Sequence, residues 1–332
     1  MRRWAILILA LALALGACTT PHVQTSLAPP PGFEGPRMEA DAFVVRDGAR
    51  LPMTAWLPAG EPRLVIVALH GMNDSRASWR LAGPWWAERG VAAYAYDQRG
   101  FGAAPGRGEW AGALMQDDLR DVVALVRARH PTATVAVAGE SMGGAVAIAA
   151  FASDRPPAAD RLILMAPAVW GWSAQAPLNR AGLWIAARAL GDRAVEAPDW
   201  AVRDIRASDN WAELIRNGRD PGSILPTRFD TLSGLVDLME TASLNLGRTR
   251  VPTLLLYGAH DAVIEAPSMR LALDRAGTPA NLTTAYYPDG WHILNRDLQA
   301  GAVFADVEAW LRDAGAPLPS GVGPIPADLR RR

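Results

Sequence analysis

The chain contains no lysine, one cysteine and five histidines among its 332 residues. The single cysteine, Cys18, excludes an internal disulfide, and a formal net charge of −1 gives no indication of nucleic acid or another highly charged polymer as a partner. No metal-ligand spacing and no nucleotide-binding glycine loop is evident, so we expect no cofactor. What is present is ordinary for a soluble globular enzyme: half of the residues are hydrophobic and a fifth are charged, and the length allows one large domain or two modest ones.

The first twenty residues, "MRRWAILILALALALGACTT", have the layout of a secretory signal. Two arginines precede an apolar run that is too short for a comfortable membrane span, which needs roughly 20 apolar residues. The end "LGAC" resembles the lipobox of bacterial lipoproteins, in which Cys18 would carry a diacylglyceryl thioether and become the mature N-terminus. The alternative is an ordinary signal peptide in which Cys18 is incidental. We expect an exported protein that is lipid-anchored to the bacterial cell envelope, at an outer membrane if the host has one, since Thr19 and Thr20 follow the cysteine in place of aspartate.

The rest of the chain alternates between apolar runs typical of buried parallel strands and amphipathic segments typical of helices. "RLVIVALHG", "VAAYAYDQRG" and "PTLLLYGAHD" read as strands, and residues 115–130 form the most regular amphipathic helix. This alternation predicts an α/β fold with a mostly parallel sheet flanked by helices. The predicted divisions are a signal peptide at 1–17, a proline-rich tether at 18–40, a core at 41–167 and 248–315, a helical insertion without a clear strand at 168–247, and an irregular tail at 316–332.

Ser141 occupies the centre of Gly139-Glu140-Ser141-Met142-Gly143, between a predicted strand and a predicted helix. That context is the one in which G-x-S-x-G forms a nucleophile elbow, where the serine is held in a strained conformation. Flanking glycines remove Cβ atoms that would collide across the sharp turn. The alternative is a tight turn in which Ser141 only caps the helix. We favour the nucleophile.

A serine hydroxyl needs a base, and the five histidines allow elimination. His22 lies in the tether and His130 ends a surface helix, whereas His292 follows the last strand in "YYPDGWHILN", the loop position that a catalytic base requires. Asp261 follows the penultimate strand in "LLLYGAHDAV" and gives the chain order Ser, Asp, His. A surface-loop role for His292 and a helix-capping role for Asp261 are the alternatives. Asp289 also competes for the role of acid, but lies too close to His292 in the loop.

Two backbone N–H groups are needed to stabilise the oxyanion of an acyl-transfer reaction. One is expected from Met142, which follows the nucleophile, and the other from Met72 in the loop "HGMND". In this interpretation His70 and Gly71 shape the loop and take no part in the chemistry.

These motifs resemble α/β-hydrolases of the monoacylglycerol lipase, lysophospholipase and serine aminopeptidase (S33-like) group. The resemblance covers about residues 43 to 313 and rests on "LHGMND", "YDQRGFGAAPG", "GESMGG", "YGAHD" and "GWH". It implies an eight-stranded sheet with a helical cap over the active site, formed by the insertion at 168–247, and it assigns the nucleophile, acid, base and oxyanion donors to the residues identified above. The chain departs from the group's R-G-H-G-x-S pattern, with Phe101 and Ala104 at the histidine and serine positions.

The first functional hypothesis is a serine hydrolase that cleaves carboxylic esters, such as monoacylglycerol or lysophospholipid, through an acyl-enzyme. Its partners would be a lipid ester and the membrane, with no nucleic acid. The second is a cap-gated aminopeptidase, which would need acidic cap residues to bind a substrate amine. The third is a non-catalytic envelope binding protein. For the aminopeptidase, the acidic candidates in the cap are Asp192, Glu196, Asp199, Asp204 and Glu213. For the ester hydrolase, the tryptophans that could pack the cap onto the core or line an acyl site are Trp170, Trp172, Trp184, Trp200 and Trp211.

Overall fold

The computed structural model of the chain describes residues 20–198, 203 and 205–329. The expected signal peptide at 1–17 and the expected lipidation residue Cys18 lie outside the described residues. Within the described part, no helix is both long enough and apolar enough to cross a membrane.

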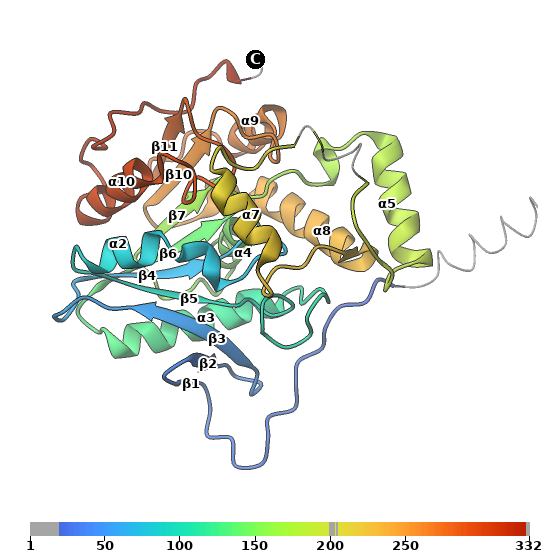
Figure 1. Cartoon of the computed structure of the whole chain (residues 1–332), viewed down its shortest axis with the longest axis horizontal. Helices are drawn as coiled ribbons and strands as arrows, with labels where there is room; N and C mark the ends of the chain where they lie inside the picture. Colours follow the sequence, from blue (N-terminus) through green and yellow to red (C-terminus); the bar gives the residue numbers. More distant parts are fainter. Residues whose placement is uncertain (1–19, 199–202, 204, 330–332) are drawn as a thin grey trace, which may run out of the picture.

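A nine-stranded sheet forms the centre of the molecule (Figure 1). Its spatial order is β1-β2-β3-β5-β4-β6-β7-β10-β11, with parallel pairing from β5 to β11 and antiparallel pairing from β1 to β5. The strands are β1 Arg37–Met38, β2 Ala42–Val44, β3 Arg50–Trp56, β4 Leu64–Leu69, β5 Val91–Tyr96, β6 Thr134–Glu140, β7 Arg161–Met165, β10 Thr253–Gly258 and β11 Leu282–Tyr287. The expected number of strands was eight. The additional strand β1 is a two-residue pairing with β2, too short to give a sequence pattern.

The two faces of the sheet bury separate apolar cores. Alternate residues of β4 divide between them: Val65, Val67 and Leu69 face one core, and Ile66 and Ala68 face the other. Helices α3, α4 and α9 contribute to the first core, and α2 and α10 to the second (Figure 1). Their bounds are α2 Ala82–Ala87, α3 Leu114–Arg129, α4 Met142–Phe151, α9 Ala266–Ala276 and α10 Ala300–Arg312, with a short 3₁₀ helix η1 at Arg76–Trp79.

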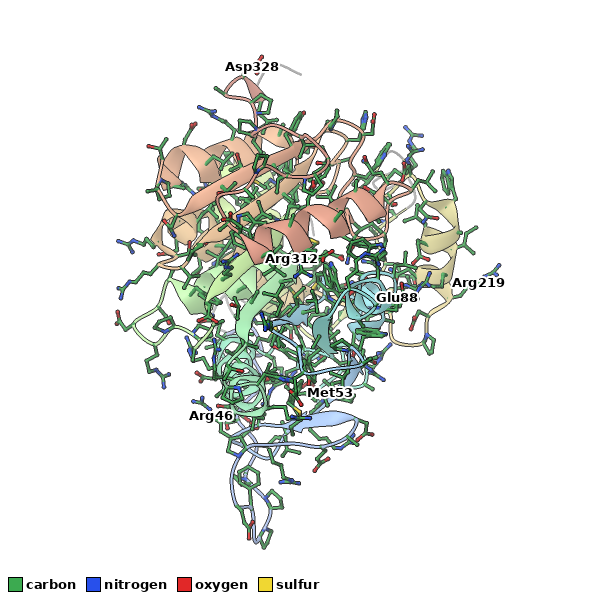
Figure 2. The ribbon with its side chains drawn as sticks, turned by 90° about the vertical axis from the view of Figure 1, so that its left-hand side faces the viewer. Arg46, Met53, Glu88, Arg219, Arg312 and Asp328 are labelled. Atoms are coloured by element: carbon green, nitrogen blue, oxygen red, sulfur yellow. The ribbon has the colours of Figure 1, made fainter. Side chains whose placement is uncertain are left out.

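Helices α2 and α10 hold each other across the second face. The indole N–H of Trp86 donates to the Phe304 carbonyl at 3.1 Å, and the Arg312 guanidinium donates to the Arg89 carbonyl at 3.1 Å. Figure 2 shows Arg312 near Glu88, which follows α2 directly. These two bonds join α2 and α10 on this face of the sheet.

The chain between β7 and β10 forms the insertion expected to be a cap. It contains η2 Trp172–Ala174, α5 Pro177–Ala189, β8 Ala194–Val195, α7 Trp211–Arg219, β9 Thr227–Arg228, α8 Phe229–Asn245 and η3 Leu246–Arg248. Helix α8 packs against α4, α5 and α9, and Arg219 at the end of α7 lies at the outer edge of the molecule (Figure 2). The sequence predicted no strand here. The structure instead pairs β8 with β9 as a two-residue antiparallel ladder.

The described part of the expected tether is packed in one stretch. The backbone N–H of Gln24 donates to the Trp110 carbonyl at 2.8 Å, and its side-chain amide donates to the carbonyls of Gly106 and Glu109 at 3.1 and 2.9 Å. Leu27 donates its N–H to the Asp47 carboxylate. The segment predicted to be a tether is therefore hydrogen-bonded to the folded part at Gln24 and Leu27, which its composition did not reveal.

Candidate active site

Four residues selected from the sequence lie beyond the carboxyl ends of parallel strands. Met72 follows β4, Ser141 follows β6, Asp261 follows β10 and His292 follows β11. Because these strands are parallel, their carboxyl ends share one edge of the sheet, which is where α/β proteins place their sites.

Ser141 lies in a sharp turn between β6 and α4, with φ 51° and ψ −115°. A positive φ is unfavourable for a residue with a Cβ, and such strain costs of order 1–3 kcal/mol. The turn needs its flanking glycines: a Cβ on Gly139 would lie 2.5 Å from the Gly144 nitrogen, and one on Gly143 would lie 2.6 Å from the Leu69 carbonyl oxygen. The geometry is therefore that of a nucleophile elbow. Ser141 makes no side-chain cap to the helix.

His292 connects the serine to an acid. Its Nε2 lies 2.9 Å from Ser141 Oγ and its Nδ1 lies 2.9 Å from Asp261 Oδ2. The other oxygen of Asp261 accepts the N–H groups of Val263 and Ile264, at 2.9 and 2.8 Å. These bonds close the turn after β10, whereas α9 begins only at Ala266, so Asp261 does not cap that helix. The carboxylate is fixed in the orientation that receives Nδ1–H.

The loops that carry the acid and the base touch each other. A Cβ on Gly258 would lie 2.5 Å from the carbonyl carbon of Gly290, so the two backbones approach as closely as glycine permits. The His260 N–H donates to the Gly290 carbonyl at 2.9 Å, and the His260 ring stacks on Trp291 with centroids 5.0 Å apart. His260 is therefore a loop-packing residue, and the close approach of the two glycines fixes the distance between acid and base.

The environment of His292 makes the imidazole more basic than usual. Burial disfavours its charged form, but the charge of Asp261 and its hydrogen bond outweigh burial, so the pKa lies above the ordinary 6.5. Glu140 raises this pKa further and Arg296 lowers it. A neutral imidazole with Nδ1–H directed at Asp261 leaves Nε2 free to accept the serine proton.

The two expected oxyanion donors lie beside the nucleophile. Met142 is the first residue of α4, where a helical N–H has no acceptor in a preceding turn. Met72 lies in a turn in which the next residue, Asn73, has φ 60°. The turn is close to the nucleophile, because a Cβ on Gly71 would lie 3.4 Å from Ser141 Cβ. Both methionines line the same cavity as Ser141.

That cavity has a volume of about 440 Å³ and is almost entirely apolar. Ser141 lines it, and Trp170, Leu183 and Leu235 line it from the insertion. The remaining lining residues are Met72, Met142, Ala168, Gln175, Asn179, Ile205, Leu232, Val236, Met239, Val263 and Ile264. Among the expected cap tryptophans, Trp170 lines the cavity, and Trp200 lies outside the described residues. The site can take an extended apolar group next to the nucleophile.

The departure at Phe101 has a structural counterpart. The Phe101 ring is fully buried and meets the His70 ring edge-on, with centroids 5.9 Å apart. Because His70 Nε2 accepts the Gln98 backbone N–H at 3.0 Å, Nδ1 carries the proton and donates to the Gly71 carbonyl at 2.8 Å. Both ring nitrogens of His70 are therefore occupied by backbone groups, as a shaping residue requires.

The remaining candidates lie elsewhere. His130 Nε2 is 2.8 Å from the Tyr94 hydroxyl, His22 lies 3.5 Å from Glu109, and Asp289 is exposed. Across the part of the chain that the structure describes, no cluster of three or more His, Cys, Asp or Glu residues is arranged to hold a metal ion.

Sequence reasoning missed a charged cluster directly behind the nucleophile. Arg296 bridges Asp74 and Glu140, and all three side chains are buried. The one available signal was Glu140 itself, a carboxylate at the end of an otherwise apolar strand, which needs a partner when buried.

Comparisons with known proteins agree with this architecture. The monoacylglycerol lipase of Mycolicibacterium smegmatis is 25% identical over 280 residues, which cover 81% of this chain and 95% of that protein. Human monoglyceride lipase is 24% identical over 286 residues, covering 83% and 91%. Among solved structures, a soluble variant of the Saccharomyces cerevisiae monoglyceride lipase superimposes with a TM-score of 0.63 at 16% identity, covering 89% of this chain and 95% of that one. The monoacylglycerol lipase of Paleococcus ferrophilus gives a TM-score of 0.61 at 17% identity, covering 79% and 98%.

The family described as serine aminopeptidase, S33, matches residues 60–299, well over half of the sequence and including all four residues at the carboxyl edge of the sheet. The chain belongs to this family and has the α/β-hydrolase fold.

Proposed function

We propose that the protein is a serine hydrolase that cleaves carboxylic esters with an apolar acyl chain through an acyl-enzyme. The observation that carries this proposal is the hydrogen-bonded series Ser141, His292, Asp261, in which Ser141 lines an apolar cavity. The names of the relatives support an ester of the monoacylglycerol type, and lysophospholipids have the same single acyl chain on a polar head group.

In the proposed reaction, Ser141 Oγ attacks the ester carbonyl carbon while its proton passes to His292 Nε2. The carbonyl oxygen becomes an oxyanion that accepts hydrogen bonds from the N–H groups of Met72 and Met142. The C–O bond to the alcohol breaks, and His292 returns the proton to the departing oxygen. A water molecule then repeats the sequence on the acyl-enzyme: His292 takes its proton, the hydroxide oxygen attacks, and Ser141 Oγ leaves with the proton.

An aminopeptidase is the second candidate, favoured by the description of the family. Such an enzyme needs a carboxylate to receive the substrate amine. None of the described residues that line the cavity is acidic, and the buried Glu213 pairs with Arg80 and Arg216. Asp192 and Glu196 do not line the cavity, while Asp199 and Asp204 lie outside the described residues. The apolar lining favours the ester.

We further propose that Cys18 is lipidated and that the protein is exported and anchored to the cell envelope. The support is the sequence "LGAC" behind an apolar run and two arginines. Mass spectrometry of the mature N-terminus tests this: a diacylated Cys18 is expected, with Cys18→Ser remaining unprocessed or unanchored. A free thiol at Cys18 of the mature protein contradicts the proposal.

The ester hydrolase is tested with the full chain purified in detergent. The parent is expected to react with a fluorophosphonate probe and to hydrolyse p-nitrophenyl esters, and Ser141→Ala is expected to lose both properties while its thermal unfolding stays close to that of the parent. Loss of a triad nucleophile removes several orders of magnitude in kcat, so retention of more than about a tenth of the activity refutes the mechanism. A parent that does not label supports the non-catalytic alternative. Faster cleavage of free-amine aminoacyl anilides than of their N-acetylated forms supports the peptidase.

A further inference from the structure

A buried cluster of three charged side chains lies behind the nucleophile. Arg296 Nη1 is 2.7 Å from Asp74 Oδ2, and Arg296 Nη2 is 2.7 Å from Glu140 Oε1. The side chains are 1%, 7% and 2% exposed, in the order Arg296, Asp74, Glu140. Burial disfavours the charge on Asp74, but Arg296 more than offsets that effect and holds the pKa of Asp74 below its ordinary value. The Arg296 guanidinium therefore lies between two buried carboxyl groups.

Each member of the cluster comes from a different segment of the active site: Asp74 from the oxyanion turn, Glu140 from the end of β6, and Arg296 from the loop after β11. Asp74 lies two residues after Met72, Glu140 directly precedes Ser141, and Arg296 lies four residues after His292. A single guanidinium thus ties the oxyanion turn to the nucleophile elbow from the loop that carries the base. The guanidinium is planar and rigid, so its Nη1 and Nη2 groups fix the relative direction of the two carboxylates. The ammonium group of a lysine would not impose this geometry.

The oxyanion turn depends on this tie. Asn73 has φ 60°, so the turn that presents Met72 N–H is strained. From the insertion, the Ile224 N–H donates to the Asn73 carbonyl at 2.9 Å and Thr227 Oγ1 accepts the Asn73 side-chain amide at 2.6 Å. On the inner side, Arg296 holds the following residue, Asp74.

The carboxylate of Glu140 also contacts the backbone of the oxyanion turn and limits how closely that turn approaches the elbow. A Cβ built on Gly71 would lie 3.2 Å from Glu140 Oε1, so the backbone just before Met72 rests against this carboxylate. A displacement of Glu140 would therefore move the turn relative to Ser141. Stability alone is a weak reason for such a cluster, since buried ion pairs can often be replaced by apolar residues without loss.

We propose that Asp74, Arg296 and Glu140 form a positioning device that holds the Met72 N–H at the distance from Ser141 Oγ required by the tetrahedral oxyanion. This inference rests on the proposed serine-hydrolase function. The three residues do not touch substrate and act through Met72 and Ser141. Because the oxyanion forms only during the reaction, the device acts on kcat and not on the binding of the ester.

The test is Arg296→Met in the full chain, with octanoyl p-nitrophenyl ester as substrate and an octyl trifluoromethyl ketone as a mimic of the tetrahedral intermediate. A misplacement of about 1 Å costs on the order of 10²-fold in rate, so we expect kcat to fall about tenfold to hundredfold. The inhibition constant of the ketone should rise by a similar factor, while KM changes by less than about threefold. Arg296→Lys keeps the charge without the fork and should recover part of the loss.

Arg99 supplies the matched control. It is equally buried and also bridges two carboxylates, those of Asp47 and Asp118, but it contacts none of the catalytic loops through them. Arg99→Met should lower the melting temperature to a similar extent as Arg296→Met and leave kcat per labelled active site and ketone inhibition near parental values. If both arginine variants lose kcat in parallel with stability, the cluster is structural only and the proposal is overturned.

The pH dependence gives an independent readout. His292 faces Asp261 from the turn after β10, Glu140 from the elbow, and Arg296 and Asp297 from its own loop. Because Glu140 raises the pKa of His292, Glu140→Gln should move the acid limb of kcat/KM to lower pH in addition to reducing kcat.

The outcomes separate the inference from the function it rests on. A folded Arg296→Met with parental kcat and ketone affinity overturns the positioning role alone. A parent that the ketone does not inhibit overturns the serine mechanism and the inference together. If Arg296→Met does not fold, Asp74→Asn carries the same test: reduced kcat with unchanged KM supports the proposal, and parental kcat refutes it.

Discussion

Replacing Asp261 with asparagine should inactivate the enzyme while leaving its fold intact. In the structure, Oδ1 of Asp261 accepts the N–H groups of Val263 and Ile264, and Oδ2 receives His292 Nδ1–H. An asparagine can keep the two backbone bonds only if its carbonyl oxygen occupies the Oδ1 position. Its NH₂ group then points at Nδ1 of the histidine and donates to it.

This donation forces the wrong tautomer of His292. With Nδ1 as an acceptor, the proton moves to Nε2, which can no longer accept the proton of Ser141. A wrong tautomer in a serine triad lowers kcat by about 10⁴-fold, equivalent to about 5.5 kcal/mol of transition-state stabilisation. The retained backbone bonds should keep the melting temperature close to that of the parent.

The assay is kcat/KM on a p-nitrophenyl ester, calculated per mole of protein that thermal unfolding shows to be folded. Fluorophosphonate labelling is not used to count active sites, because labelling itself depends on the base. Asp289→Asn is the matched control, because Asp289 is an exposed carboxylate in the loop of His292 and should leave the rate unchanged. A folded Asp261→Asn that retains more than about a hundredth of the parental kcat/KM refutes this reasoning. Inactivation of the Asp289 variant in its place would identify that residue as the acid.

The remaining predictions concern the base, the pH dependence and the cavity. His292→Ala should lose turnover as completely as Ser141→Ala, whereas His260→Ala, which removes only a stacking partner of Trp291, should keep much of its activity; the reverse result in a kcat assay shows that the base is misassigned. Because Asp261 raises the pKa of His292, kcat/KM should rise with pH through a midpoint above 6.5, and a midpoint at or below 6.5 contradicts the electrostatic account. Because the pKa of His292 is higher in the folded state than in the unfolded state, proton binding to His292 stabilises the fold. This stabilisation is complete below the unfolded-state pKa and is lost as pH rises through the folded-state pKa. The contribution of His292 to thermal stability should therefore fall over the pH range in which activity rises. Each methylene removed from water contributes about 0.8 kcal/mol, or up to about fourfold in kcat/KM. We therefore expect kcat/KM to increase from acetyl to octanoyl esters, and to increase less steeply after Leu235→Ser in the cavity wall. A preference for acetyl esters would exclude the lipid-ester interpretation.

The fold could be predicted because its central elements have strong sequence patterns. The runs that form β4, β5 and β10 are buried throughout and, apart from Thr253 at the start of β10, consist of apolar residues, tyrosine and glycine, as is typical of strands covered on both faces. The elements that escaped prediction, β1, β8 and β9, are two residues long each and exist only through their pairing. A two-residue pairing has no periodicity that a sequence could display.

The packed N-terminal stretch shows a second reason for failure. Proline and small polar residues correctly indicate that residues 20–36 form no helix or strand. They cannot indicate whether another segment offers partners. Gln24 finds them 82 and 85 residues away, in the carbonyls of Gly106 and Glu109. Composition therefore predicts the absence of regular structure but not the absence of packing.

The catalytic residues of the site could be predicted from the sequence, but the charged cluster beside them could not. Ser141, Asp261 and His292 could be selected because each follows a recognisable strand in a fixed chain order, and the geometry brings them within hydrogen-bonding distance. The cluster behind them could not be selected, because Arg296 reaches Glu140 across 156 residues and Asp74 across 222. A carboxylate that ends a buried strand needs a cation somewhere in the fold, and only the tertiary arrangement of loops decides which one. In this fold the cation is Arg296, on the loop that carries the base. In the proposed positioning role, residues that chain order predicts are therefore held in place by an ion-pair cluster that chain order does not predict.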